Sequence, residues 1–296
     1  IFDKAERRLE NARESTQEAL ETLGERKLRA WDEQVGRFVD LFGQLRNVEI
    51  SDVPDVESFE GEALAQKELR EMEEMSLEAT EAVKGGSTAV GSGALAGIAS
   101  YGGASMAATA STGTAISSLS GAAAQSATLA WFGGGSLAAG GAGVAGGAAV
   151  LGGIGAAPVL AVGGALYSAK QDKNLSKAKE MKAEAKQAAE EMKTAQSVAE
   201  GIGDIASQYE SFIGQFVKRM DQSLDALESV IEENGPDYQS MPEEDRRVVH
   251  VAVQFTQVLK SLLTTPLLNE NGSLAAGAPD ALESGRSFLK SDFSKK

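Results

Sequence analysis

Hydrophobic residues recur at alternating intervals of three and four over the first 45 residues, which is the spacing of one face of an α-helix. The repeat breaks near Gly24 and resumes in a new phase. Its positions are Phe2, Ala5, Leu9, Ala12, Thr16, Ala19 and Leu23, then Leu28, Trp31, Val35, Phe38, Phe42 and Leu45. After a loop around Pro54 the same spacing returns. Its positions there are Ala65, Leu69, Met72, Ser76, Ala79 and Val83. The pattern predicts amphipathic helices in residues 1–84.

The longest repeat lies in residues 170–235, where Gly235 and Pro236 end it. Its positions are Ala178, Met181, Ala185, Ala188, Met192, Ala195, Ala199, Ile202, Ala206, Tyr209, Ile213, Phe216 and Met220, then Leu224, Leu227 and Ile231. Roughly 60 helical residues would form a rod of about 90 Å. The first half of the repeat is lined with alanine, which lets another helix approach closely. We predict that this helix packs against the N-terminal helix as a long antiparallel coiled coil or helical bundle.

Residues 236–296 contain a shorter predicted helix and a tail. Ser240 and Glu243 have the spacing of a capping box, with Pro242 in the first turn. The expected buried stripe is Val248, Val251, Phe255, Val258 and Leu262. A further short helix is expected near "DALESGRSFLK". The whole chain is therefore predicted to be all-α.

Charge separates the middle of the chain from both ends. Residues 1–84 hold 12 Lys and Arg and 22 Asp and Glu, and the residues after 169 hold 16 and 21. Residues 85–169 hold no charged residue at all and 22 of the 33 glycines. A flexible linker is a poor explanation, because this run also carries many large apolar residues that a solvated linker would expose.

Two other interpretations of residues 85–169 stay open. Small residues recur at every fourth position, including Gly93 with Gly97 and the GxxxG pair Gly143 and Gly147. Such faces allow helices to pack closely, either inside a sheath of amphipathic helices or within a lipid bilayer. The zone is therefore predicted to be an apolar, glycine-zipper-like helical hairpin.

A membrane location would explain several further features of this hairpin. The run can supply two long or up to four short spans. Candidate residues for the membrane–water interface are Tyr101, Trp131, Phe132 and Tyr167, and Pro158 would kink the returning arm. Lysines cluster from Lys170 to Lys182, which would place the charged helices on the cytoplasmic side of a membrane. Since alanine and glycine are only marginally apolar, a soluble form with a sheathed hairpin is also expected.

Composition disfavours most other classes of function. The net charge of −15 argues against nucleic-acid binding, and the chain has no cysteine and a single histidine, His250. No phosphate-binding loop, calcium loop or nucleophile–base set is recognisable, so no enzyme, metal site, cofactor or small-molecule substrate is predicted. The expected partners are a lipid bilayer and further copies of the chain.

The run "ATASTGTAISSLSGAAAQSATLAWFGGGSLAAGGAGVAGGAAVLGGI" resembles a stretch of a widespread group of bacterial proteins of unassigned function. "ERKLRAWDEQVGRFVDLFGQLRNVE" and "TTPLLNENGSL" resemble the same group, so the likeness covers most of the chain. It implies the order long helix, membrane-like segment, long charged helix. That order is also similar to the architecture of α-helical pore-forming toxins, in which an uncharged hairpin inserts.

The sequence thus predicts a non-enzymatic, membrane-interacting helical protein that inserts its apolar hairpin into a bilayer, as an oligomeric pore or a membrane-perturbing effector. The alternative is a soluble coiled-coil scaffold or adaptor whose glycine-rich segment is a close-packed core.

Overall fold

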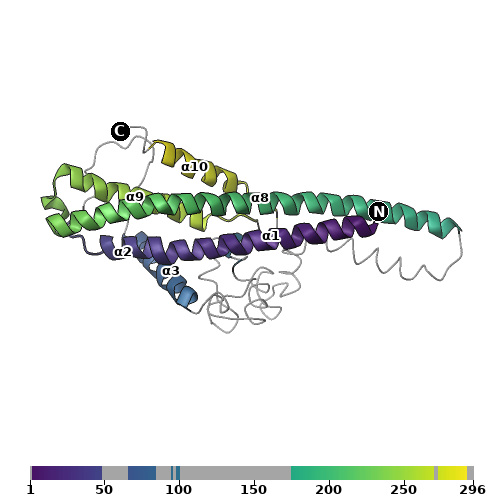
Figure 1. The fold of residues 1–296 in the computed structure, drawn as a ribbon, viewed down its shortest axis with the longest axis horizontal. Helices are drawn as coiled ribbons and strands as arrows, with labels where there is room; N and C mark the ends of the chain where they lie inside the picture. The colour runs from purple at the N-terminus through teal and green to yellow at the C-terminus, as the bar shows by residue number, and fades with distance from the viewer. Residues whose placement is uncertain are drawn as a thin grey trace.

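The computed structural model describes residues 2–48, 66–84, 95, 98–100, 175–269 and 273–291. The helices are α1 (Phe2–Ala30), a π-helical turn (Trp31–Val35), α2 (Gly36–Phe42), α3 (Gln66–Lys84), α8 (Leu175–Asn234), a 3-10 turn (Tyr238–Ser240), α9 (Glu243–Thr264) and α10 (Gly277–Ser291). Within these ranges the chain is helical apart from turns and two isolated bridges, which confirms the all-α class. The molecule is elongated: α1 and α8 lie side by side, and α3, α9 and α10 cover them towards one end (Figure 1).

The two long helices, α1 and α8, run parallel to each other. Thr16 contacts Ala199, Arg26 contacts Glu210, and Arg37 contacts Glu228 further along. The sequence separation between partners stays between 183 and 191 over this distance, whereas in an antiparallel pair it would change by two for every residue advanced. The predicted antiparallel arrangement of these helices is therefore wrong. A hydrophobic seam has the same spacing in either direction, so the repeat alone does not specify orientation.

The parallel arrangement separates the two described flanks of the uncharged zone. Ser100 is the last described residue before the gap in the middle of the chain. The carbonyl of the preceding residue, Ala99, accepts a hydrogen bond from Lys27, whose Nζ lies over the ring of Tyr209. The described chain resumes at Leu175, roughly 34 helical residues and about 50 Å before Tyr209 along α8. The two described flanks, Ser100 and Leu175, therefore lie far apart along the α1–α8 pair and not together at one tip of it.

The N-terminal helix continues through Gly24 and changes phase further on. Within the π-helical turn, the backbone N–H of Gly36 donates to the carbonyl of Trp31, which adds one residue to that turn. A side chain at Gly36 would come within 2.6 Å of the Ser76 hydroxyl on α3, so the glycine allows α3 to pack closely. The helix therefore does not have the break predicted near Gly24; instead, the side of the helix that is buried changes along its length.

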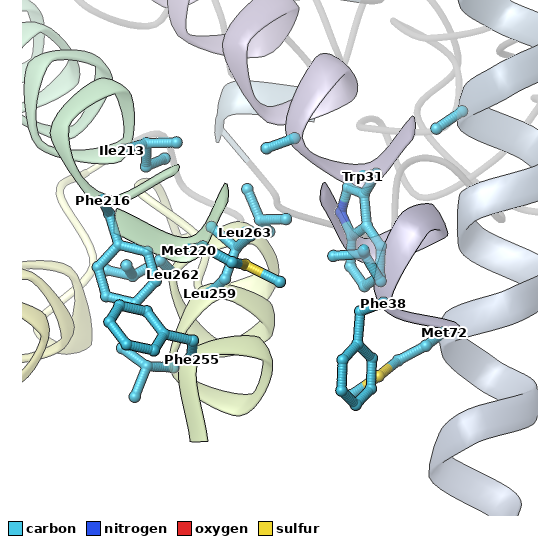
Figure 2. Packing of buried hydrophobic residues seen from close by; sticks show 14 of the residues in the cluster. Trp31, Phe38, Met72, Ile213, Phe216, Met220, Phe255, Leu259, Leu262 and Leu263 are labelled. Atoms are coloured by element: carbon cyan, nitrogen blue, oxygen red, sulfur yellow. The ribbon is translucent and has the colours of Figure 1, made fainter. Parts of the chain in front are cut away.

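The main core joins α8, α9 and α10 through aromatic rings. The centroids of Phe216 and Phe255 are 5.4 Å apart, and those of Phe255 and Phe288 are 5.0 Å apart at nearly a right angle. Figure 2 shows Phe216 and Phe255 facing each other, with Trp31 and Phe38 of the N-terminal rod in the same field. Edge-to-face and tilted ring pairs of this kind stabilise a core beyond their burial alone.

The C-terminus of α8 and the N-terminus of α9 test two predictions. Gly235 has a φ of +77° and follows the last residue of α8, so the predicted stop is confirmed. The predicted capping box is wrong: α9 begins after Pro242 with no side-chain cap, and the Ser240 hydroxyl donates to the carbonyl of Asp237 instead. That bond closes the preceding 3-10 turn, so the Ser240 hydroxyl is not available to cap the backbone N–H groups of α9.

A buried hydroxyl joins α1 to α8 beside Gly203, where the two helices pack closely. Thr16 Oγ1 donates to the carbonyl of Ala199 at 2.7 Å, and a Cβ on Gly203 would lie 3.2 Å from that hydroxyl. We expect Thr16→Val to lower the free energy of unfolding by about 1 kcal/mol in urea titrations. Thr22→Val is the matched control, because its exposed hydroxyl bonds only within α1, to the Glu18 carbonyl. Equal effects of the two variants would contradict a contribution from the interhelical bond.

Candidate functional site

All of the sequence-predicted site residues lie outside the described part of the chain. They are Gly93, Gly97, Tyr101, Trp131, Phe132, Gly143, Gly147, Pro158 and Tyr167. From the uncharged zone the structure describes Leu95, Ile98, Ala99 and Ser100, which we call the docked residues. Their surroundings define the candidate site.

The docked residues are buried in the helical bundle. Leu95 is 8% exposed, Ile98 is 3% exposed, and Ala99 and Ser100 are completely covered. The carbonyl of Ser100 accepts hydrogen bonds from the backbone N–H groups of Leu267 and Leu268, at 2.7 and 2.9 Å. The start of the uncharged zone is thereby fixed to the connection between α9 and α10.

Gly24 provides the surface of α1 on which the docked residues rest. A Cβ at this position would overlap the backbone carbonyl of Leu95. A backbone group cannot rotate away as a flexible side chain can, so the close contact requires glycine. The sequence analysis treated Gly24 as an interruption of the helix, whereas its role is to make space for another part of the chain.

Lys27, one turn after Gly24, is the buried cation of the site. Its side chain has 0% exposure. Its Nζ donates to the carbonyls of Ala99 at 3.4 Å and Thr265 at 3.2 Å. No described carboxylate lies within ion-pair distance of it, and burial lowers the pKa of Lys27 to about 7. Lys27 thus joins α1 to the docked residues and to the end of α9.

Tyr209 completes the site from α8. Its ring centroid lies 5.7 Å from Lys27 Nζ, and its hydroxyl donates to the carbonyl of Ala278 in the first turn of α10 at 2.6 Å. Burial raises the pKa of Tyr209, so the phenol stays protonated and neutral at physiological pH. Four separate parts of the chain therefore meet around one buried lysine.

The sequence analysis missed Lys27, although a signal was available. Leu20, Leu23 and Lys27 have the i, i+3, i+7 spacing of one helix face, and all three are buried. The predicted hydrophobic phase resumes at Leu28, one residue after this lysine. A lysine on the hydrophobic face of a helix indicates a specific buried partner, because lysine is almost never fully buried without one.

Burial also raises the pKa of Glu78 on α3 and lowers that of His250 on α9. His250 is half-buried, with no hydrogen-bond partner at Nδ1 within the described part of the chain. No group of three His, Asp or Glu side chains with metal-binding geometry occurs among the described residues. No helix within the described ranges combines the length and the apolar character needed to cross a bilayer.

No protein-family model, curated protein or solved structure matches the chain. The resemblance to a group of bacterial proteins therefore stays a prediction.

Proposed function

We propose that the protein is a non-enzymatic helical protein whose uncharged zone, residues 85–169, enters a lipid bilayer as an oligomeric pore or membrane-perturbing effector. In this proposal the helical bundle holds the start of the zone, and the charged helices stay on the cytoplasmic side. The alanine-lined α1–α8 pair forms a parallel coiled coil, and the small-residue faces around Gly143 and Gly147 pack as a glycine zipper within the membrane.

The charge-free run of about 85 residues is the observation that carries the proposal. A solvated surface of that length would normally carry charged side chains. In the hydrocarbon core of a bilayer, by contrast, an ionised side chain is strongly unfavourable. The contacts of the docked residues also support it. Their hydrogen bonds to the bundle run through the backbone carbonyls of Ala99 and Ser100, which water can also satisfy after release.

A soluble scaffold or adaptor is the second candidate, and the burial of the docked residues favours it. Leu95 and Ile98 pack in the same core as Trp31 and Leu267. If the rest of the zone packs in the same way, the glycines serve only close helix contacts.

Liposome flotation and dye release test the first candidate against a matched variant. Since the flanks are about 50 Å apart, a simple deletion would strain the bundle. The control therefore replaces residues 101–169 with a Gly/Ser linker of equal length, whose root-mean-square end-to-end distance is about 45 Å. We expect the natural chain to float with phosphatidylcholine vesicles and release trapped dye, and the linker variant to do neither. Equal flotation of both proteins, or of neither, would contradict insertion of this zone.

Tryptophan fluorescence separates the two candidates. The chain has two tryptophans, and Trp31 is 1% exposed in the bundle core. In a Trp31→Phe variant the only reporter is Trp131, and brominated lipids quench a tryptophan that enters the acyl region. Quenching is expected for a membrane protein. Emission that does not change with lipid, together with a monodisperse protein, would instead establish the scaffold.

A further inference from the structure

The buried Lys27 has a hydrogen-bonding environment suited to a neutral amine. A neutral lysine amine has two N–H donors, and among the described residues its hydrogen-bond acceptors are the carbonyls of Ala99 and Thr265. An ammonium has three donors and a full charge. Its contact with the Tyr209 ring, whose centroid lies 5.7 Å away, is near the outer limit for a cation–π contact. The site therefore satisfies the deprotonated lysine and leaves the protonated one short of a partner.

The elements around Lys27 also contain charged groups, several of which form ion pairs with one another. Arg26 and Glu210 form an ion pair between α1 and α8 at 2.8 Å. Lys260 on α9 pairs with Glu68 on α3 at 2.9 Å. On α10, Arg286 lies 4.0 Å from Glu283 of the same helix. Tyr209 is the titratable group in contact with Lys27, and its phenol stays neutral across the physiological range because burial raises its pKa. The protonation of Lys27 is thus set by burial of its own side chain.

We propose that Lys27 is a proton-operated latch on the uncharged zone: the neutral amine holds the docked residues in the bundle, and its protonation to the ammonium favours their release. The inference rests on the proposed function, because release would free the start of the zone for a membrane. The proton balance is simple. Docking transfers one proton from the Lys27 ammonium to solvent, and undocking takes it up again.

The direction of the pH effect follows from linkage. In the docked state burial lowers the pKa of Lys27 to about 7, from 10.5 for a solvated lysine. Between these two values the undocked state binds one proton more, so docking strengthens as pH rises. Below about pH 7 both states are protonated, and the dependence levels off. The undocked fraction should therefore rise by up to about tenfold for each pH unit lowered from pH 9 to pH 7.

A single engineered cysteine reports the docked state, because the natural chain has none. Ser100→Cys is suitable, since the Ser100 side chain is completely buried and its hydroxyl has no hydrogen-bond partner. Ser229→Cys, on an exposed position of α8, corrects for the intrinsic pH dependence of the thiol reagent. Ser223→Cys, buried in α8 with an unpartnered hydroxyl, reports opening of the whole bundle.

Without lipid, we expect Ser100→Cys to react faster than Ser223→Cys, and its corrected rate to rise by one to two orders of magnitude from about pH 9 to about pH 6. A Lys27→Met substitution in the Ser100→Cys chain should remove that dependence and keep the rate low, because the apolar side chain needs no partner. Three outcomes would each overturn the latch. These are a corrected rate that does not change with pH, equal rates at the two buried cysteines, and an unchanged pH dependence in Lys27→Met.

The readout without lipid keeps the two proposals distinguishable. If labelling follows the expected pH profile while the natural chain fails to float with phosphatidylcholine vesicles, the latch stands and membrane insertion fails. If the chain floats equally well at about pH 6 and about pH 9 while labelling does not change, insertion stands and the latch is overturned. Circular dichroism of each variant confirms that the helices are retained.

Discussion

Phe216→Ala is expected to lower the free energy of unfolding by about 3–5 kcal/mol, the usual cost of removing a buried phenylalanine. Phe216 is completely buried on α8 and contacts rings on both neighbouring helices, Phe255 on α9 and Phe288 on α10. Its removal therefore leaves a cavity where three helices meet, and no single helix can move to fill it. Urea unfolding followed by circular dichroism measures the loss.

The control for Phe216→Ala is Val198→Ala on the same helix. Val198 is 44% exposed on α8, so its truncation should change stability by no more than about 0.5 kcal/mol. A loss below about 1.5 kcal/mol for Phe216→Ala would mean that the α9–α10 pair does not pack on α8 as a unit. The comparison separates the aromatic core from general effects of shortening a side chain on α8.

Periodicity predicted most of the helical elements correctly because each helix buries one face. The seam of residues 170–235 corresponds to α8, and the stop at Gly235 is confirmed by its positive φ. The stretch led by Leu69 and Met72 corresponds to α3. These features depend on residues near one another in sequence, and local spacing is the information that a single sequence holds most directly.

Orientation and long-range contacts were not predictable in the same way. The seams of α1 and α8 are compatible with either direction, and the direction depends on how the intervening chain returns. The docking of Leu95 on Gly24 joins residues 71 positions apart and leaves no periodic signal. The capping-box spacing of Ser240 and Glu243 failed for a related reason, because the Ser240 hydroxyl closes a turn at Asp237.

The candidate site depends on residues that composition does not single out. The glycines of residues 85–169 are numerous, whereas Gly24 is a single glycine at a predicted break in a helix. In the described structure both Gly24 and Lys27 of α1 contact docked residues of the uncharged zone. One glycine and one lysine in a charged helix carry no compositional signal. Their significance appears only when their burial is known.

Gly24→Ala and Gly201→Ala make a matched pair, because both glycines lie inside long helices and alanine favours a helix by about 0.5–1 kcal/mol. A Cβ at Gly201 meets nothing within 4 Å, so Gly201→Ala should stabilise the protein by about that amount. A Cβ at Gly24 would overlap the Leu95 carbonyl. Overpacking of this kind costs about 1–3 kcal/mol, so Gly24→Ala should be destabilising despite the better helix former.

The two variants should also differ in the state of the docked residues. To accommodate the new methyl group, Leu95 must move away from α1, which weakens the hydrogen bonds from Leu267 and Leu268 to Ser100. Gly24→Ala should therefore accelerate thiol labelling of Ser100→Cys, while Gly201→Ala leaves it slow. If Gly24→Ala instead stabilised the chain as much as Gly201→Ala does, the uncharged zone would not rest on α1 at this point. The buried environment of Lys27 would then need another explanation, because the docked residues supply one of the two acceptors that the described structure gives it, the carbonyl of Ala99.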